Sequence, residues 1–129
     1  MDDPYDFITK VRTDYFKALG KFIHEFSETE SVLAAILEKM TEVDILVARA
    51  LFSGVRAEAA TKYIARLQEA LKSPTEERNE IQAVFTQLGI ITLIRNDIVH
   101  YGTDFYGPGP DYATTNKRVA LTKSRFRKS

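Results

Sequence analysis

The densest group of side chains capable of chemistry lies in one short segment, Arg95-Asn96-Asp97-Ile98-Val99-His100-Tyr101. Arginine presents a planar set of N–H donors that matches phosphate oxygens, and histidine exchanges a proton near neutral pH. Together these two residue types suit the cleavage of a phosphodiester bond with acid-base catalysis. Arg95, Asn96 and His100 are therefore the candidate catalytic residues.

Helical spacing decides which of these side chains share a face. Asn96 and His100 are one turn apart, so the amide can orient the imidazole or share a ligand with it. Asp97 and Tyr101 form a similar, supporting pair on the adjoining strip. Arg95 is rotated by about 140° from His100, so only its long side chain or a second copy of the helix can complete the site.

The composition argues against a metal or another cofactor at this segment. The chain has two His and no Cys, and no carboxylates cluster beside His100, so we expect no metal site and no cofactor. A structural role is the alternative for Arg95 and His100, because a His near a helix C-terminus suits the helix dipole and an Arg often covers a core. His24, beside Glu25 and Glu28, is expected at the surface.

The elements that position this segment are predicted to be helices. Asp3 is a suitable N-cap with Pro4 at the first helical position, and one stripe of residues keeps helical phase along residues 4–40. Ser27 and Glu30 could restart the helix as a capping box, but the unbroken phase favours a single long helix. The stripe comprises Val11, Tyr15, Ala18, Phe22, Phe26, Thr29, Leu33, Ile36 and Met40.

Three further amphipathic or apolar stretches follow. A short one runs from Val43 to Phe52, and a third helix has an apolar face of Ala60, Tyr63, Ile64, Leu67 and Leu71. Ser73-Pro74-Thr75-Glu76 predicts the start of a fourth helix, which reaches about Tyr101, where Gly102 can close it. Its apolar positions are Ile81, Val84, Leu88, Ile91, Ile94 and Ile98. Ile90 and Leu93 lie on its opposite flank, so this helix is either central or buried against a second subunit.

We therefore predict an all-α protein, an antiparallel bundle of about four helices with a long first helix. A Gly/Pro turn at residues 106–110 then leads into a short appendage that is non-helical or a β-hairpin. The domain prediction is a helical bundle over 1–102 and a basic C-terminal arm over 103–129, which is not an independent domain.

The net charge of zero hides an asymmetry. Residues 1–111 contain 18 acidic and 12 basic residues, a net charge of −6, whereas residues 112–129 contain six basic residues and no acidic one. The arm is thus a candidate nucleic-acid contact, with a solvated terminus as the alternative. Its basic residues are Lys117, Arg118, Lys123, Arg125, Arg127 and Lys128.

No signal peptide or apolar run long enough to cross a bilayer is evident, so we expect a cytoplasmic protein without membrane contact.

The motif Arg95-Asn96-Asp97-Ile98-Val99-His100 resembles the Arg, polar residue, three residues, His signature of the HEPN superfamily, whose members are helical bundles with this motif near the end of a late helix. The long first helix with aromatic residues and the Glu28-Thr29-Glu30 sequence also fits, as does Gly102 after the motif. The resemblance covers residues 4–102.

This resemblance implies a metal-independent endoribonuclease that acts as a homodimer, with motifs from two subunits lining one cleft. His100 would transfer a proton to or from the ribose 2′-hydroxyl or the leaving oxygen. Arg95 would hold the scissile phosphate, and Asn96 would orient His100 or the phosphate. A toxin or defence effector with an antitoxin or nucleotidyltransferase-type partner protein is an analogy from fold and motif. The alternatives are a catalytically silent helical module for dimerisation or for RNA or nucleotide binding, and a structural subunit of a larger complex.

Overall fold

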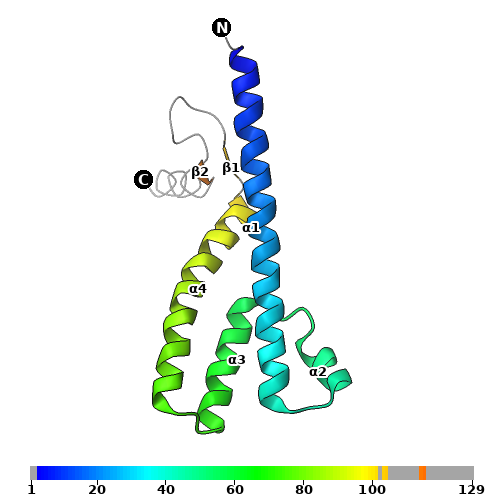
Figure 1. The fold of residues 1–129 in the computed structure, drawn as a ribbon, viewed down its shortest axis with the longest axis vertical. Helices are drawn as coiled ribbons and strands as arrows, with labels where there is room; N and C mark the ends of the chain where they lie inside the picture. The colour runs from blue at the N-terminus through cyan, green and yellow to red at the C-terminus, as the bar shows by residue number, and fades with distance from the viewer. Residues whose placement is uncertain (1–2, 102, 105–113, 116–129) are drawn as a thin grey trace, which may run out of the picture. The chain divides into compact units, whose positions relative to one another are not determined.

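A computed structural model describes residues 3–101, 103–104 and 114–115 of the chain. These residues form four helices, α1 (Pro4–Thr41), α2 (Ile45–Phe52), α3 (Ala57–Ala70) and α4 (Thr75–Tyr101), shown in Figure 1. The predicted all-α helical bundle with a long first helix is confirmed. The described residues group into two compact units, one of residues 14–92 and one drawn from residues 1–13 and 93–129.

Helix α1 begins as the sequence predicts. The Asp3 carboxylate accepts a hydrogen bond from the backbone N–H of Tyr5 at 3.0 Å, and Pro4 is the first helical residue. The alternative restart at Ser27 does not occur, because the helix is continuous there. Instead the Ser31 hydroxyl donates to the Ser27 carbonyl oxygen at 3.1 Å, a bond within the helix that leaves the backbone ladder intact.

Glu30 has a different role from the one that the capping-box alternative gives it. Its carboxylate accepts a hydrogen bond from the backbone N–H of Ala57 at 2.7 Å and lies 3.5 Å from Nη1 of Arg56. The Glu30 side chain is 13% exposed. A residue of α1 thus satisfies a backbone donor in the first turn of α3, where a negative charge also suits the helix dipole.

The core of residues 14–92 is a seam between α1 and α3. Leu37, Ala60 and Ile64 are at most 1% exposed, and Phe26, Leu33 and Ala57 complete the cluster. The two alanines leave room for the larger α1 side chains. Partly buried apolar side chains from all four helices and from the connection after α2 pack against the cluster, namely Met40, Phe52, Val55, Leu67, Phe85 and Leu88.

The burial pattern corrects the predicted apolar faces at several positions. Leu37 is fully buried in α1, whereas Ile36 of the predicted stripe is 37% exposed. Two members of the predicted α3 face, Tyr63 and Leu71, are 43% and 57% exposed. On α4 it is Phe85 and Leu88 that pack against the core, while Val84, Ile91 and Ile94 are exposed. The spacing of apolar residues predicted the helices correctly. Each apolar stripe is wider than the face that packs against a neighbouring helix, so the spacing alone does not show which residues of the stripe are buried.

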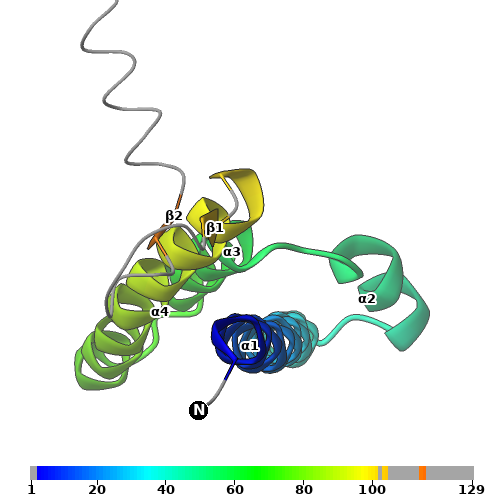
Figure 2. The same ribbon diagram turned by 90° about the horizontal axis from the view of Figure 1, so that it is seen from above.

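The connections follow local backbone rules. Asp44 caps α2 by accepting from the Leu46 N–H at 2.8 Å, and α2 stands apart from α3 and α4 beside α1 (Figures 1 and 2). Helix α3 closes on Lys72, which has a left-handed φ of 55°, and the Ser73 N–H bonds to the Gln68 carbonyl oxygen at 2.9 Å. Helix α4 then begins at Thr75, within the segment Ser73-Pro74-Thr75-Glu76 that the sequence predicts as its start.

The predicted C-terminal appendage is described only in part. Thr103–Asp104 (β1) pairs with Thr114–Thr115 (β2) in an antiparallel arrangement, with Thr103 opposite Thr115. Gly102 and the rest of the arm lie outside the described residues. The division into a bundle and an arm at residue 102 therefore stays a prediction.

The contact between Glu30 and the start of α3 is expected to contribute to stability. Replacing Glu30 with Ala leaves the Ala57 N–H without its acceptor, so the free energy of unfolding should fall by about 1–3 kcal/mol. Urea denaturation followed by circular dichroism at fixed protein concentration measures this change. The control Glu28→Ala removes an exposed carboxylate from the same helix and should change stability by less than about 0.5 kcal/mol. Equal effects of the two substitutions would contradict the role of Glu30.

Candidate active site

The whole candidate motif lies on the last turns of α4. Residues from Arg95 to Tyr101 are helical, so their side chains project at the angles that the sequence predicts. The acidic residues of this helix's first turn, Glu76 and Glu77, lie at the opposite end from His100, which is in the last turn. The motif thus occupies the end of a late helix, as expected for residues that must be held on a rigid element.

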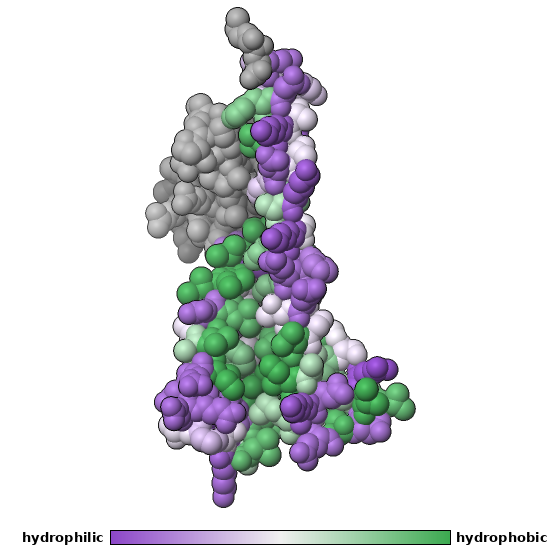
Figure 3. All heavy atoms as spheres, viewed as in Figure 1, coloured by the Kyte–Doolittle hydropathy of each residue, from purple (hydrophilic) through white to green (hydrophobic). Residues whose placement is uncertain are grey.

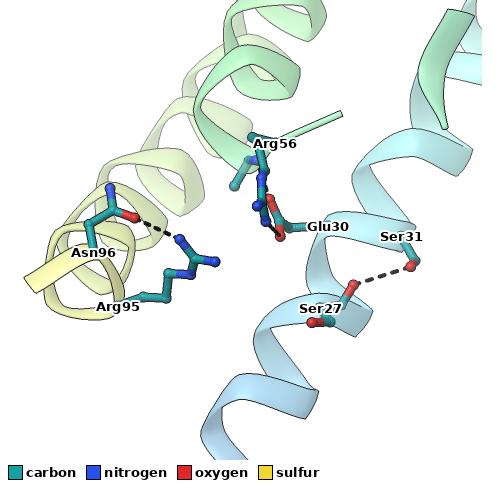
Figure 4. Close-up of polar contacts among 7 residues, drawn as sticks. Ser27, Glu30, Ser31, Arg56, Arg95 and Asn96 are labelled. Atoms are coloured by element: carbon teal, nitrogen blue, oxygen red, sulfur yellow. Dashed lines mark hydrogen bonds and ion pairs between the residues drawn. The ribbon is translucent and has the colours of Figure 1, made fainter. Parts of the chain in front are cut away.

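Arg95 and Asn96 are joined by a hydrogen bond. Nη1 of Arg95 donates to Oδ1 of Asn96 at 3.1 Å, and both side chains are half-buried (Figure 4). The bond fixes the Asn96 amide with its oxygen toward the guanidinium, so its NH₂ group is directed to other partners. A ligand meeting this pair therefore encounters N–H donors from both side chains, which suits an anionic oxygen.

His100 is exposed and forms no hydrogen bond with any described residue. Of the two arrangements that the sequence allows for Asn96 and His100, the direct hydrogen bond is not formed, and the Asn96 oxygen accepts from Arg95. The shared ligand stays a prediction. An accessible imidazole one turn from the Arg95–Asn96 pair remains able to exchange a proton with a bound molecule.

The supporting and distant candidates are described to different extents. Asp97 is half-buried on α4. Its predicted partner Tyr101 is the last residue of the helix, and the Tyr101 side chain lies outside the described part of the chain. The six basic candidates of the arm, Lys117, Arg118, Lys123, Arg125, Arg127 and Lys128, also lie outside the described residues. Their roles stay predictions.

His24 is at the surface, as expected. Its Nε2 lies 3.1 Å from Oε1 of Glu28, one turn along α1, and both side chains are largely exposed. Within the described part of the chain, no group of three or more His, Cys, Asp or Glu side chains is arranged to hold a metal ion.

Helix α4 also carries apolar side chains that the chain leaves in solvent. Six large ones are at least 42% exposed, namely Val84, Ile90, Ile91, Leu93, Ile94 and Val99. Figure 3 shows apolar residues gathered over α4. The sequence left two alternatives for the second apolar flank, a central position in the bundle or burial against another subunit. Among the described residues this flank is exposed and not central, and its burial against another subunit stays a prediction.

Comparison of the chain with protein-family models, with curated proteins and with solved structures finds no match. The resemblance to the HEPN superfamily therefore stays a prediction from the sequence. No helix among the described residues is both long and apolar enough to cross a membrane.

Proposed function

We propose that the protein is a metal-independent endoribonuclease of the HEPN type. The observation that carries the proposal is the hydrogen-bonded Arg95–Asn96 pair with an exposed His100 one turn further along the same helix. The pair offers donors to a phosphodiester, and the imidazole is open to the hydroxyl that attacks it. Arg and His also satisfy the motif that the sequence shares with this superfamily.

In the proposed reaction, His100 takes the proton of a ribose 2′-hydroxyl. The 2′-oxygen attacks the adjacent phosphorus, the bond from phosphorus to the 5′-oxygen breaks, and a protonated imidazole returns a proton to that oxygen. The products are a 2′,3′-cyclic phosphate and a 5′-hydroxyl. Arg95 and the Asn96 NH₂ group stabilise the charge that develops on the phosphate oxygens in the transition state.

The reaction is proposed to take place in a cleft shared by two copies of the chain. Arg95 and His100 differ by about 140° around α4, so a second copy of the helix is the natural source of the opposing pair. The exposed apolar side chains of α4 support this arrangement, because a dimer would remove them from water.

The same exposed surface favours a second candidate function. A catalytically silent helical module would use the apolar flank of α4 to dimerise and would retain Arg95 and Asn96 only to bind RNA or a nucleotide. This alternative requires no proton transfer by His100, so the two candidates differ in whether the imidazole is essential.

Replacing His100 with Ala should abolish RNA cleavage. Loss of the group that moves the proton is expected to slow cleavage by at least about 100-fold while leaving the fold unchanged, since His100 is exposed. Cleavage of a labelled RNA in the presence of EDTA, with detection of the cyclic phosphate end, measures the effect. His24→Ala is the matched control, because it removes the other exposed imidazole. If RNA stays intact with the wild type across varied substrates, the silent module is the better description.

Introducing a charge on the apolar flank of α4 should prevent dimerisation. We expect the wild type to sediment as a dimer at micromolar concentration and Leu93→Glu, at a position 64% exposed, to sediment as a folded monomer with impaired cleavage. Gln82→Glu adds the same charge at an exposed position of α4 that lies more than two turns before Ile90 and Leu93 and about 160° around the helix from Val84, and it serves as the control. A wild-type monomer under these conditions would argue against a shared cleft.

Neutralising the arm should weaken RNA binding in a salt-dependent way. Changing all six basic residues of 112–129 to Gln removes charges that we propose bind phosphates, so the slope of log affinity against log salt should fall by about 0.7 for each phosphate that the arm no longer neutralises. Binding of single-stranded RNA across a salt series measures this slope. An unchanged slope would identify the arm as a solvated terminus.

A further inference from the structure

Helix α3 carries a second group of basic residues outside the candidate active site. Arg56 precedes the helix, and Lys62 and Arg66 lie on it together with Tyr63, in an open depression of about 340 Å³. We refer to Arg56, Lys62, Tyr63 and Arg66 as the α3 surface. The spacing of three, four and seven residues among them puts them on one side of the helix.

The α3 surface faces away from the core of residues 14–92. The buried residues of α3 are Ala57, Ala60, Ile64 and Gln68, which lie on the opposite side of the helix. The side chains of Arg56 and Lys62 are 69% and 65% exposed, and Tyr63 is 43% exposed. Packing therefore does not explain why an aromatic ring lies among three cations at this site.

Tyr63 and Arg66 are arranged together. The guanidinium carbon of Arg66 lies 6.0 Å from the centre of the Tyr63 ring, within the range of a cation–π contact. An exposed aromatic ring and a guanidinium plane are the two kinds of protein surface on which unpaired bases stack. The pair thus offers a stacking position next to a positive charge.

The existing ion pairs on this surface can be exchanged at small cost. Lys62 lies 3.7 Å from Glu58, and both side chains are more than half exposed, so the pair contributes little to stability. Arg56 is 3.5 Å from Glu30, but that carboxylate is also bonded to the Ala57 N–H, and the remaining guanidinium donors can serve another acceptor. From Arg56 to Arg66 the helix rises by about 15 Å, enough to meet several successive nucleotides.

We propose that the α3 surface binds single-stranded RNA, with a base stacked on Tyr63 and phosphates bound by Arg66, Lys62 and Arg56. The inference rests on the proposed function for the choice of RNA as the polyanion. It deepens that function by giving the helical body its own substrate-binding surface, one that recognises an unpaired strand by stacking and charge without reading base identity.

The test measures binding by full-length protein in a His100→Ala background, so that the RNA is not cut. A fluorescent single-stranded RNA of about 12 nucleotides is titrated at several salt concentrations between about 50 and 200 mM. Arg66→Glu should weaken binding by about tenfold or more and lower the salt slope by about 0.7 for each phosphate that is no longer neutralised. Tyr63→Ala should weaken binding by about fivefold or more with little change in slope, because it removes stacking and no charge.

Three further variants act as controls. Lys39→Glu makes a charge reversal at an exposed position of α1 and should bind RNA as the parent does. Tyr63→Phe keeps the ring and should retain affinity, and Arg66→Lys should retain most of the salt slope while losing part of the affinity. Circular dichroism of every variant establishes that the helices are intact.

The inference is overturned if Arg66→Glu and Tyr63→Ala both bind as Lys39→Glu does. It is equally overturned if Tyr63→Ala binds RNA with unchanged affinity and inorganic polyphosphate displaces the RNA fully, since the surface is then a general anion site. Failure of the ribonuclease proposal appears separately, as intact RNA with the wild type in EDTA. In that case weaker binding by the two variants still supports the α3 surface.

Discussion

The arrangement of the helical core depends on one carboxylate. Glu30 projects from the middle of α1 and accepts the backbone N–H of Ala57, so it joins a position well inside one helix to the first turn of another. Helix ends expose unsatisfied N–H groups, and an acceptor supplied from a neighbouring helix satisfies one of them and sets where α3 begins. Leu33 and Leu37 then follow Glu30 along α1 as Ala60 and Ile64 follow Ala57 along α3, and these four residues belong to the same buried cluster. The two helices consequently run in the same direction, and one polar contact marks the register of the apolar seam.

Helices α3 and α4 each pack one face against the core, so their other faces are available to contact other molecules. Helix α3 covers its alanines and Ile64 and presents Tyr63 among cations, while α4 places Phe85 and Leu88 against the core and leaves other large apolar residues in solvent. The candidate catalytic residues occupy the end of α4. The surfaces that we propose to be functional are therefore distributed over different helices: the candidate catalytic residues at the end of α4, the exposed apolar residues along its flank, and basic and aromatic residues on α3. Such a division lets each surface change without altering the seam.

Much of the fold was predictable because it depends on local rules. The bounds of α1, its Asp3 cap and the position of Arg95 to His100 on the last helix follow from capping residues and helical phase. The buried faces were predicted less well, since Tyr63 and Ile36 are apolar residues in the right phase that the partner helices do not cover. The contact of Glu30 could not be predicted, because it joins residues 27 positions apart and the same Ser27–Glu30 spacing also fits a local capping box. At the site, the pairing of Arg95 with Asn96 depends on rotamers of adjacent side chains, which the spacing of the helix does not determine.

The connection between α1 and α3 has a consequence for how the chain can vary. Because both helices run in the same direction, residues 42–56 must carry the chain back along the length of the seam, and α2 is part of that return. The entropy of closing such a loop grows only with the logarithm of its length, by about 0.6 kcal/mol for each doubling. Gly54 has a left-handed φ of 75° and no atoms near the position of a missing side chain, so the chain at Ser53-Gly54 has space around it. Lengthening of the chain at this turn is therefore inexpensive, and related chains with the same seam can differ widely in the size of this return segment.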